Sequence, residues 1–144
     1  MAQLSLLGVF AHPDDEQGMT GAFLRAHTQN IETGLICATR GELGEIAYPE
    51  LGTPETLGTV REAEMRAAAE VANIDQLWFL DYRDSGMMGT PGNEDPTSFY
   101  RVNDDEALAK IVKIIRDFKP TLLVTFDATG GYGHPDHLTI HRLT

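Results

Sequence analysis

The chain has 144 residues, of which 42% are hydrophobic and 23% charged, the balance of a soluble globular protein with one domain. Its net charge of −11 argues against binding to nucleic acid or to an anionic membrane surface, because both require a basic patch. No apolar stretch approaches the roughly 18 residues that span a bilayer, and the N-terminus lacks the basic segment of a signal peptide. The single cysteine, Cys37, lies in an apolar run, so we expect a buried thiol in a cytoplasmic protein.

Strand-like and helix-like segments alternate along the chain. Apolar runs predict four strands, at 4–11, 33–38, 76–80 and 121–126. Helical spacing of apolar residues predicts three helices between them, over 19–28, over 59–71 and from 103 to just before Pro120. Thr59 and Asn103 each stand three residues before a glutamate, so a capping box is predicted at both helix starts. Two segments rich in turn residues, 40–57 and 81–102, are predicted to be long loops.

This alternation predicts an α/β fold, a Rossmann-like, doubly wound and mainly parallel sheet with helices on both faces. In the common Rossmann order the first and fourth strands are neighbours, and ligands bind beyond the carboxyl ends of those strands. The turn after the first strand carries no glycine-rich fingerprint, which argues against a dinucleotide cofactor.

Two clusters of histidine and acidic residues follow these two strands. One reads AHPDDE over 11–16, and the other reads GHPDH over 133–137. Ordinary helix-start chemistry would explain the prolines and the acids, but it leaves the histidines unexplained. If the fold joins the clusters, they offer three His or Asp ligands for a catalytic zinc ion and a spare carboxylate as a general base. The available donors are His12, Asp14, Asp15, Glu16, His134, Asp136 and His137.

Together with three further segments, the two clusters resemble the LmbE-like (PIG-L) family of zinc-dependent de-N-acetylases. The further segments are TRGELG at 39–44, REAE at 61–64 and YRDSGM at 82–87. The resemblance implies a hydrolase that removes the acetyl group from an N-acetylglucosamine-type conjugate by metal-activated water. It implies Zn²⁺ as the cofactor, with Fe²⁺ left open as the metal in the cell, and a small acetamido sugar as the partner.

The resemblance also implies roles by position. His12, Asp15 and His137 would bind the metal, and Asp14 would be the general base. Glu16 is interpreted as a structural acceptor that ties down the loop of the first cluster.

The remaining roles concern the substrate and the transition state. A protonated His134 would stabilise negative charge or protonate the departing amine, and Asp136 would orient a histidine. Tyr132 would donate a hydrogen bond to the oxyanion, while Arg61 and Asp84 match the sugar-contacting positions of the family. The simpler alternatives are packing for Tyr132, a surface pair with Glu64 for Arg61, and a loop pair with Arg83 for Asp84.

The chain ends at Thr144, seven residues after His137, whereas members of the family continue for many tens of residues. We therefore expect residues 1–144 to form a single LmbE-like deacetylase domain that lacks the family's C-terminal portion. Two alternatives stay open: a metal- or sugar-binding module or fragment without turnover, and another zinc hydrolase on the same scaffold. A homo-oligomer that covers an exposed face is also open.

Overall fold

A computed structural model describes residues 4–144, and the structural statements below concern those residues. Its four strands form one sheet in the order β3-β2-β1-β4, and every neighbouring pair is parallel. The strands are β1 (Ser5–Phe10), β2 (Glu32–Thr39), β3 (Gln76–Tyr82) and β4 (Leu122–Val124). This arrangement confirms the predicted α/β class and places the first and fourth strands side by side.

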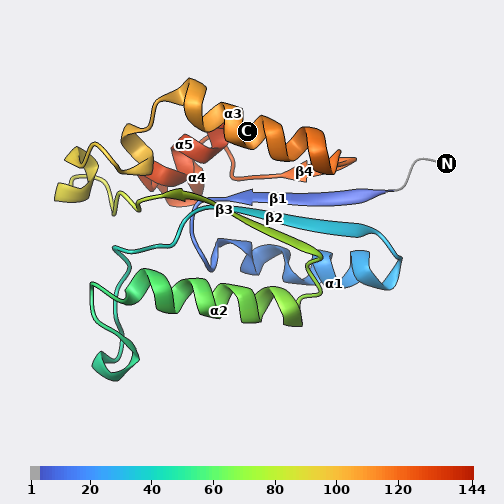
Figure 1. Cartoon of the computed structure of the whole chain (residues 1–144), viewed down its shortest axis with the longest axis horizontal. Helices are drawn as coiled ribbons and strands as arrows, with labels where there is room; N and C mark the ends of the chain where they lie inside the picture. Colours follow the sequence, from blue (N-terminus) through green and yellow to red (C-terminus); the bar gives the residue numbers. More distant parts are fainter. Residues whose placement is uncertain (1–3) are drawn as a thin grey trace.

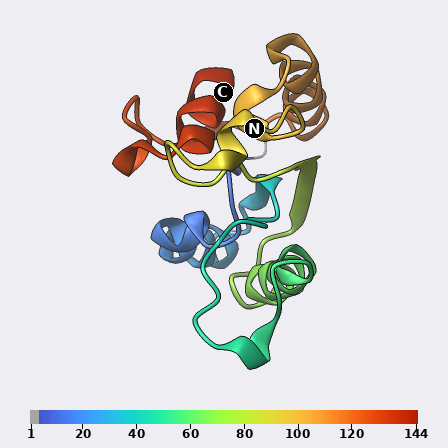
Figure 2. The same ribbon diagram turned by 90° about the vertical axis from the view of Figure 1, so that its left-hand side faces the viewer.

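Helices cover both faces of the sheet (Figure 1). Figure 2 shows α1 and α2 on one side of the sheet and α3 and α5 on the other. The longer helices are α1 (Thr20–Thr28), α2 (Leu57–Val71), α3 (Asp104–Phe118) and α5 (Pro135–Leu143). The short ones are η1 (Asp15–Met19), η2 (Pro49–Leu51), η3 (Pro91–Glu94), η4 (Phe99–Arg101) and α4 (Gly130–Gly133). Within residues 4–144, no helix has the length and apolarity needed to cross a membrane.

The central strand β1 contributes to two hydrophobic cores, because successive side chains of a strand point to opposite faces. The core under α3 and α5 includes Leu7, Val9, Ile36, Ile111, Phe118 and Ile140. The core under α1 and α2 includes Leu6, Phe10, Phe23, Leu35 and Met65. All six residues of β1 are buried. The loop that follows this strand therefore starts from a rigid position.

The start of α2 differs from the prediction. The helix begins at Leu57 with Thr56 at its N-cap position, so Thr59 lies inside the first turn and the capping box predicted there is wrong. A turn closed by the Thr53 amide, which donates to Thr56 Oγ1 at 2.8 Å, starts the helix early. At α3 the N-cap half of the predicted box is confirmed, because the Asn103 side chain accepts a hydrogen bond from the backbone N–H three residues later.

The fourth strand is shorter than its apolar run. β4 covers only Leu122–Val124. On either side of it, threonine hydroxyls add side-chain contacts to β1: Thr121 Oγ1 donates to the Ser5 carbonyl and Thr125 Oγ1 donates to the Val9 carbonyl, each at 2.8 Å. These contacts hold the chain beside β1 as far as Thr125.

Candidate metal centre

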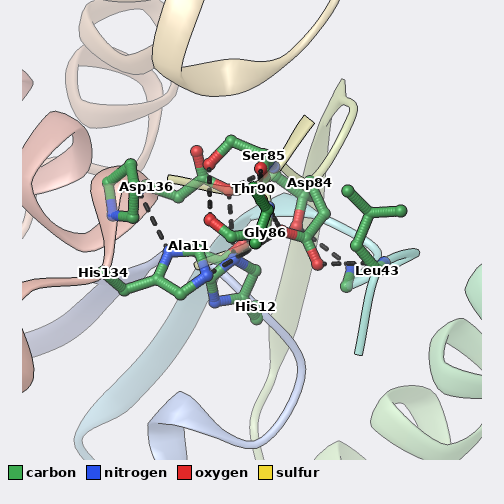
Figure 3. Close-up of polar contacts among 12 residues, drawn as sticks. Ala11, His12, Leu43, Asp84, Ser85, Gly86, Thr90, His134 and Asp136 are labelled. Carbon is green, nitrogen blue, oxygen red and sulfur yellow. Dashed lines mark hydrogen bonds and ion pairs between the residues drawn. The ribbon is translucent and has the colours of Figure 1, made fainter. Parts of the chain in front are cut away.

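The fold brings the two predicted clusters together at the carboxyl edge of the sheet. His12 follows β1 directly, while His134 and His137 lie at the start of α5, which the chain enters after β4. Because β1 and β4 are neighbours, their following segments meet. Figure 3 shows His12, His134 and Asp136 converging with Asp84 from the loop after β3.

Three predicted metal ligands form a compact set. His12 Nδ1 lies 3.1 Å from His137 Nε2. The Asp15 carboxylate places Oδ2 at 3.5 Å from His12 Nδ1 and Oδ1 at 3.2 Å from His137 Nε2. Donors around a tetrahedral zinc ion with bonds of about 2.0–2.2 Å stand roughly 3.3–3.6 Å apart. The three separations are of this order, with one Asp15 oxygen beside each imidazole nitrogen.

Hydrogen bonds on the far side of each imidazole favour the tautomer that a metal requires. His137 Nδ1 lies 3.0 Å from the Gly130 carbonyl, which can only accept, so Nδ1 carries the hydrogen and Nε2 keeps its lone pair. His12 Nε2 lies 3.2 Å from Asp136 Oδ2, which leaves the His12 Nδ1 lone pair free in the same way. His12 Nδ1 and His137 Nε2 are thus the two nitrogens left for a metal, and they lie 3.1 Å apart.

The ring of His137 is fixed by two further contacts. Phe126 stacks on it with ring centroids 3.9 Å apart and planes 11° apart. Gly130, whose φ is +61°, approaches so closely that an added Cβ would lie 2.9 Å from His137 Cβ. Only glycine satisfies both the backbone conformation and this approach.

His134 is a competing donor, which the sequence offered as a possible ligand and the resemblance assigned to the transition state instead. Its ring nitrogens come close to those of His12 and His137, and also to the carboxylates of Asp84 and Asp136. However, the Asp136 amide donates to His134 Nδ1 at 3.2 Å and so caps α5. This bond puts the hydrogen of a neutral imidazole on Nε2, where it blocks metal binding. Asp15 stays the predicted third ligand, with one carboxylate oxygen near each of the other two imidazoles.

The ionisable side chains of the centre shift one another's pKa values. Burial disfavours a charged His12, but hydrogen bonds with Asp136, Asp15 and Asp84 outweigh it and raise the His12 pKa well above its usual value. Burial opposes ionisation of Asp15 as well, yet its bonds with His12 and His137 lower the Asp15 pKa. Burial and the nearby charge of His12 lower the pKa of His134 to about 4.

Asp14 stands apart from the compact set and faces solvent. Its side chain is 60% exposed, and its φ of +98° is unusual for a residue with a side chain. Glu16 Oε2 accepts a hydrogen bond from the Asp14 amide at 2.9 Å, as expected of a residue that ties down this loop. Partial burial raises the pKa of the Asp14 carboxyl, and the charge of Arg61 opposes that rise.

Asp84 is buried and fully engaged. Its carboxylate accepts from the amides of Leu43 at 3.1 Å and Gly86 at 2.7 Å, and Oδ1 lies 3.5 Å from His12 Nε2. The simpler alternative of a pair with Arg83 is wrong, because Arg83 pairs with Asp95 at 3.2 Å. Asp84 thus joins two loops to the centre.

Arg61 pairs with Asp14, whose Oδ2 lies 3.2 Å from Arg61 Nη2, and the alternative of a surface pair with Glu64 does not describe the structure. Tyr132 is 67% exposed and meets the ring of His137 edge-on, with centroids 5.0 Å apart.

Sequence reasoning missed Ser85, whose backbone amide donates to Asp136 Oδ2 at 2.9 Å. No side-chain pattern signals a contact made by a backbone amide.

A pocket of about 460 Å³ opens beside the centre. Its lining includes six of the predicted site residues, His12, Asp14, Arg61, Asp84, Tyr132 and His134. The rest of its wall comes from Leu43, Gly44, Glu45, Gly86 and Met87. Asp14, Arg61, Asp84, Tyr132 and His134, the predicted substrate and acid–base residues, thus border one cavity beside the His12 imidazole.

The fold and this group of buried His and Asp residues define an α/β protein with a candidate metal site at the edge of its sheet. Residues 7–144 match the family model of PIG-L, GlcNAc-PI de-N-acetylase. The chain therefore belongs to the PIG-L (LmbE-like) family.

The chain is also similar to a curated relative and, in fold, to two solved structures. The 1D-myo-inositol 2-acetamido-2-deoxy-alpha-D-glucopyranoside deacetylase of Acidothermus cellulolyticus is 44% identical, over 97% of this chain and 51% of its own length. The N,N'-diacetylchitobiose deacetylase of Pyrococcus horikoshii superposes with a TM-score of 0.76 at 24% identity, covering 96% of this chain and 47% of its own. GalB, a 4-carboxy-2-hydroxymuconate hydratase of Pseudomonas putida, gives 0.73 at 25% identity, covering 97% and 53%. The chain spans about half the length of these proteins.

Proposed function

We propose that this chain acts as a zinc-dependent hydrolase that removes the acetyl group from an N-acetylglucosamine-type conjugate. The observation that carries the proposal is the division of the cluster into two parts. The side chains of His12, Asp15 and His137 contact one another within 3.5 Å, while Asp14 and His134 line the adjoining pocket. A hydrolase that uses a metal-activated water needs these two sets of groups side by side.

The donor set supports zinc as the ion. Two imidazoles and one carboxylate are ligands that catalytic zinc accepts, with a further position left for water or substrate. When bound, zinc supplies a Lewis acid that polarises the acetamide carbonyl and lowers the pKa of the attacking water. Asp136 and the Gly130 carbonyl would keep His12 and His137 in the orientation that holds it.

Asp14 is proposed as the general base. Its carboxylate lies one residue from the ligand Asp15 and faces the pocket, so it can accept a proton from the attacking water. As the C–N bond breaks, the departing nitrogen needs a proton, and the protonated Asp14 can return one. Water and the acetamide are thereby converted to acetate and a free amine.

His134 is proposed as a hydrogen-bond donor to the oxyanion. We expected a protonated His134, but its surroundings hold the neutral form at pH 7, since they lower its pKa to about 4. Because Nδ1 accepts from the Asp136 amide, the neutral ring still has an N–H at Nε2. That group can stabilise the developing negative charge without being an acid. Tyr132, at the pocket rim, is proposed as a second donor.

The proposed substrate follows from the relatives. The Acidothermus protein is named for an acetamido glucoside of inositol, and it shares 44% of aligned residues with this chain. An acetamido sugar would place its carbonyl near His134 and its ring toward Arg61 and Asp84, which border the same pocket. We therefore propose a glycoside of N-acetylglucosamine as the substrate class.

The test is release of free amine from a panel of N-acetylglucosamine conjugates, including the inositol glycoside, by protein loaded with one equivalent of zinc. The wild type should release amine and acetate in equal amounts, and Asp14→Asn should lower the rate by at least about 100-fold. The matched control is Asp105→Asn, an exposed carboxylate on α3, which should keep the wild-type rate. Zinc and sugar binding without hydrolysis would select the binding-module alternative, and cleavage of acetyl esters alone would select another hydrolase.

A further inference from the structure

Arg61 connects three segments that are far apart in the sequence. From the first turns of α2, its Nη1 donates to the Gly41 carbonyl at 2.9 Å, in the loop after β2. Its Nη2 donates to the Pro13 carbonyl and lies 3.2 Å from Asp14 Oδ2, in the loop after β1. The side chain is only 16% exposed. We call this set of contacts the Arg61 clamp.

The clamp acts on a residue whose backbone is strained. Asp14 has a φ of +98°, a conformation that is unfavourable for a residue with a side chain. Such a conformation persists only where the surroundings impose it. Arg61 contacts both the carbonyl just before Asp14 and the Asp14 carboxylate, so it restrains the backbone and the side chain together.

The clamp also depends on a glycine. Gly41 has a φ of +64°, and a Cβ added there would lie 1.8 Å from Arg61 Nη1 and 2.5 Å from Arg61 Cζ. No side chain tolerates such an overlap, so any residue other than glycine at this position would force the guanidinium away. Glycine is therefore required at position 41 for two reasons, the backbone conformation and the space that the Arg61 guanidinium occupies.

We propose that Arg61 is a positioning residue for Asp14, and that Gly41 is required because it admits the Arg61 guanidinium. This inference rests on the proposed function of Asp14 as the general base. It goes beyond the sugar contact expected of Arg61, because the clamp acts through Asp14 whether or not the remaining guanidinium N–H groups reach a sugar. Loss of the clamp should misplace the base, and a misplacement of about 1 Å can cost about 100-fold in rate.

The kinetic test separates positioning from substrate binding. Arg61→Ala should lower kcat by about 10- to 100-fold because the base is misplaced, whatever a lost sugar contact does to KM. Guanidinium ion added at millimolar concentration should restore part of that rate. The kcat of Arg61→Lys should lie between that of the wild type and that of Arg61→Ala, because one ammonium cannot make all the contacts of the planar guanidinium. A raised KM at unchanged kcat would show that Arg61 is a sugar ligand and would overturn the proposal.

A double mutant tests the dependence on Gly41. Gly41→Ala should lower kcat about as much as Arg61→Ala, but it should cause no further loss in the Arg61→Ala background, where no guanidinium remains to be displaced. The matched control is Gly89→Ala, because Gly89 has a φ of +85° and open space around its Cβ position. Independent, multiplying losses from Gly41→Ala and Arg61→Ala would contradict the proposal.

Amide hydrogen exchange gives a readout that needs no turnover. The Gln17 amide donates to the Asp14 carbonyl at 3.1 Å and the Asp14 amide donates to Glu16 at 2.9 Å, so both report on the loop. Exchange at these amides should accelerate in Arg61→Ala and in Gly41→Ala, and it should stay at the wild-type rate in Gly89→Ala. Unchanged exchange in the first two variants would refute the clamp. If exchange changes as expected while the wild type releases no amine, the proposed function fails and the clamp stands.

Discussion

His12 Nε2 lies 3.2 Å from Asp136 Oδ2, although 124 positions separate the two residues. The contact joins the loop after β1 to the start of α5, and the Ser85 amide brings the loop after β3 to the same carboxylate. One buried side chain therefore orients a predicted metal ligand and holds together the three segments that form the site. Substitution of Asp136 therefore tests directly whether this contact holds His12 in place.

Replacing Asp136 should weaken metal binding while the fold remains. Asp136→Asn keeps the shape of the side chain but removes the charge that accepts from His12, so the Kd for zinc should rise by about tenfold or more. Competition with a chromophoric chelator measures this affinity, and Asp105→Asn on α3 serves as the control. An Asp136→Asn affinity within twofold of the wild type would mean that the contact does not support the centre.

Substitutions at two neighbouring glycines, Gly130 and Gly131, distinguish the effect of a steric contact on stability from that of backbone strain. Gly130→Ala should destabilise the fold by about 2–3 kcal/mol and weaken zinc binding, because the new Cβ meets His137 at 2.9 Å and φ is +61°. Gly131→Ala has the same kind of strain, with φ at +70°, but open space around its Cβ position, so about 1 kcal/mol is expected. Urea unfolding in chelator measures both changes. Equal losses in the two variants would contradict the assigned contact.

The stabilising effect of zinc should grow with pH. Protons compete with the metal for imidazole nitrogen, and in the metal-free fold the His12 pKa is raised above its ordinary value of 6.5. That shift stabilises the metal-free fold fully below about pH 6.5 and is lost as pH rises through the raised value. The Tm difference between zinc-loaded and chelator-treated protein should therefore increase from pH 6 to pH 8.5. A difference that is constant or falls with pH would contradict this linkage.

The single thiol should be unreactive in the folded protein. Cys37 is buried in β2, and burial raises the pKa of its thiol well above the usual value, so almost no thiolate is present at pH 8. A thiol-specific disulfide reagent should label less than about a tenth of the protein in an hour under native conditions. In guanidinium chloride it should label one thiol per chain. Rapid native labelling would show that β2 opens or that the thiol is accessible.

Much of the fold follows from the sequence because its signals are local. Continuous apolar runs predicted four strands near their observed positions, and the alternation with helices predicted a parallel sheet with β1 beside β4. The N-cap at Asn103 was predicted from a short-range pattern, and it is present. At α2 the same pattern failed at Thr59, since a turn at Thr53 that no capping signal marks starts the helix two residues earlier.

The site was predictable as a set of residues but only partly as a set of contacts. The meeting of His12 with His137 follows from strand order, because both clusters come after neighbouring strands. The neutral form of His134 does not follow, since its pKa depends on burial and on the charge of His12. The contact between Arg61 and Asp14 was also missed, because it joins two loops whose separation only the folded backbone defines.

The central claim is that one ion binds among His12, Asp15 and His137 and leaves Asp14 and His134 free for chemistry. Anomalous diffraction at the zinc edge from crystals grown with one equivalent of zinc tests it most directly. The account predicts a single peak within about 2.0–2.3 Å of His12 Nδ1, His137 Nε2 and an Asp15 oxygen, with no bond to His134. A peak coordinated by His134 and Asp84, or no peak at this edge of the sheet, would contradict it.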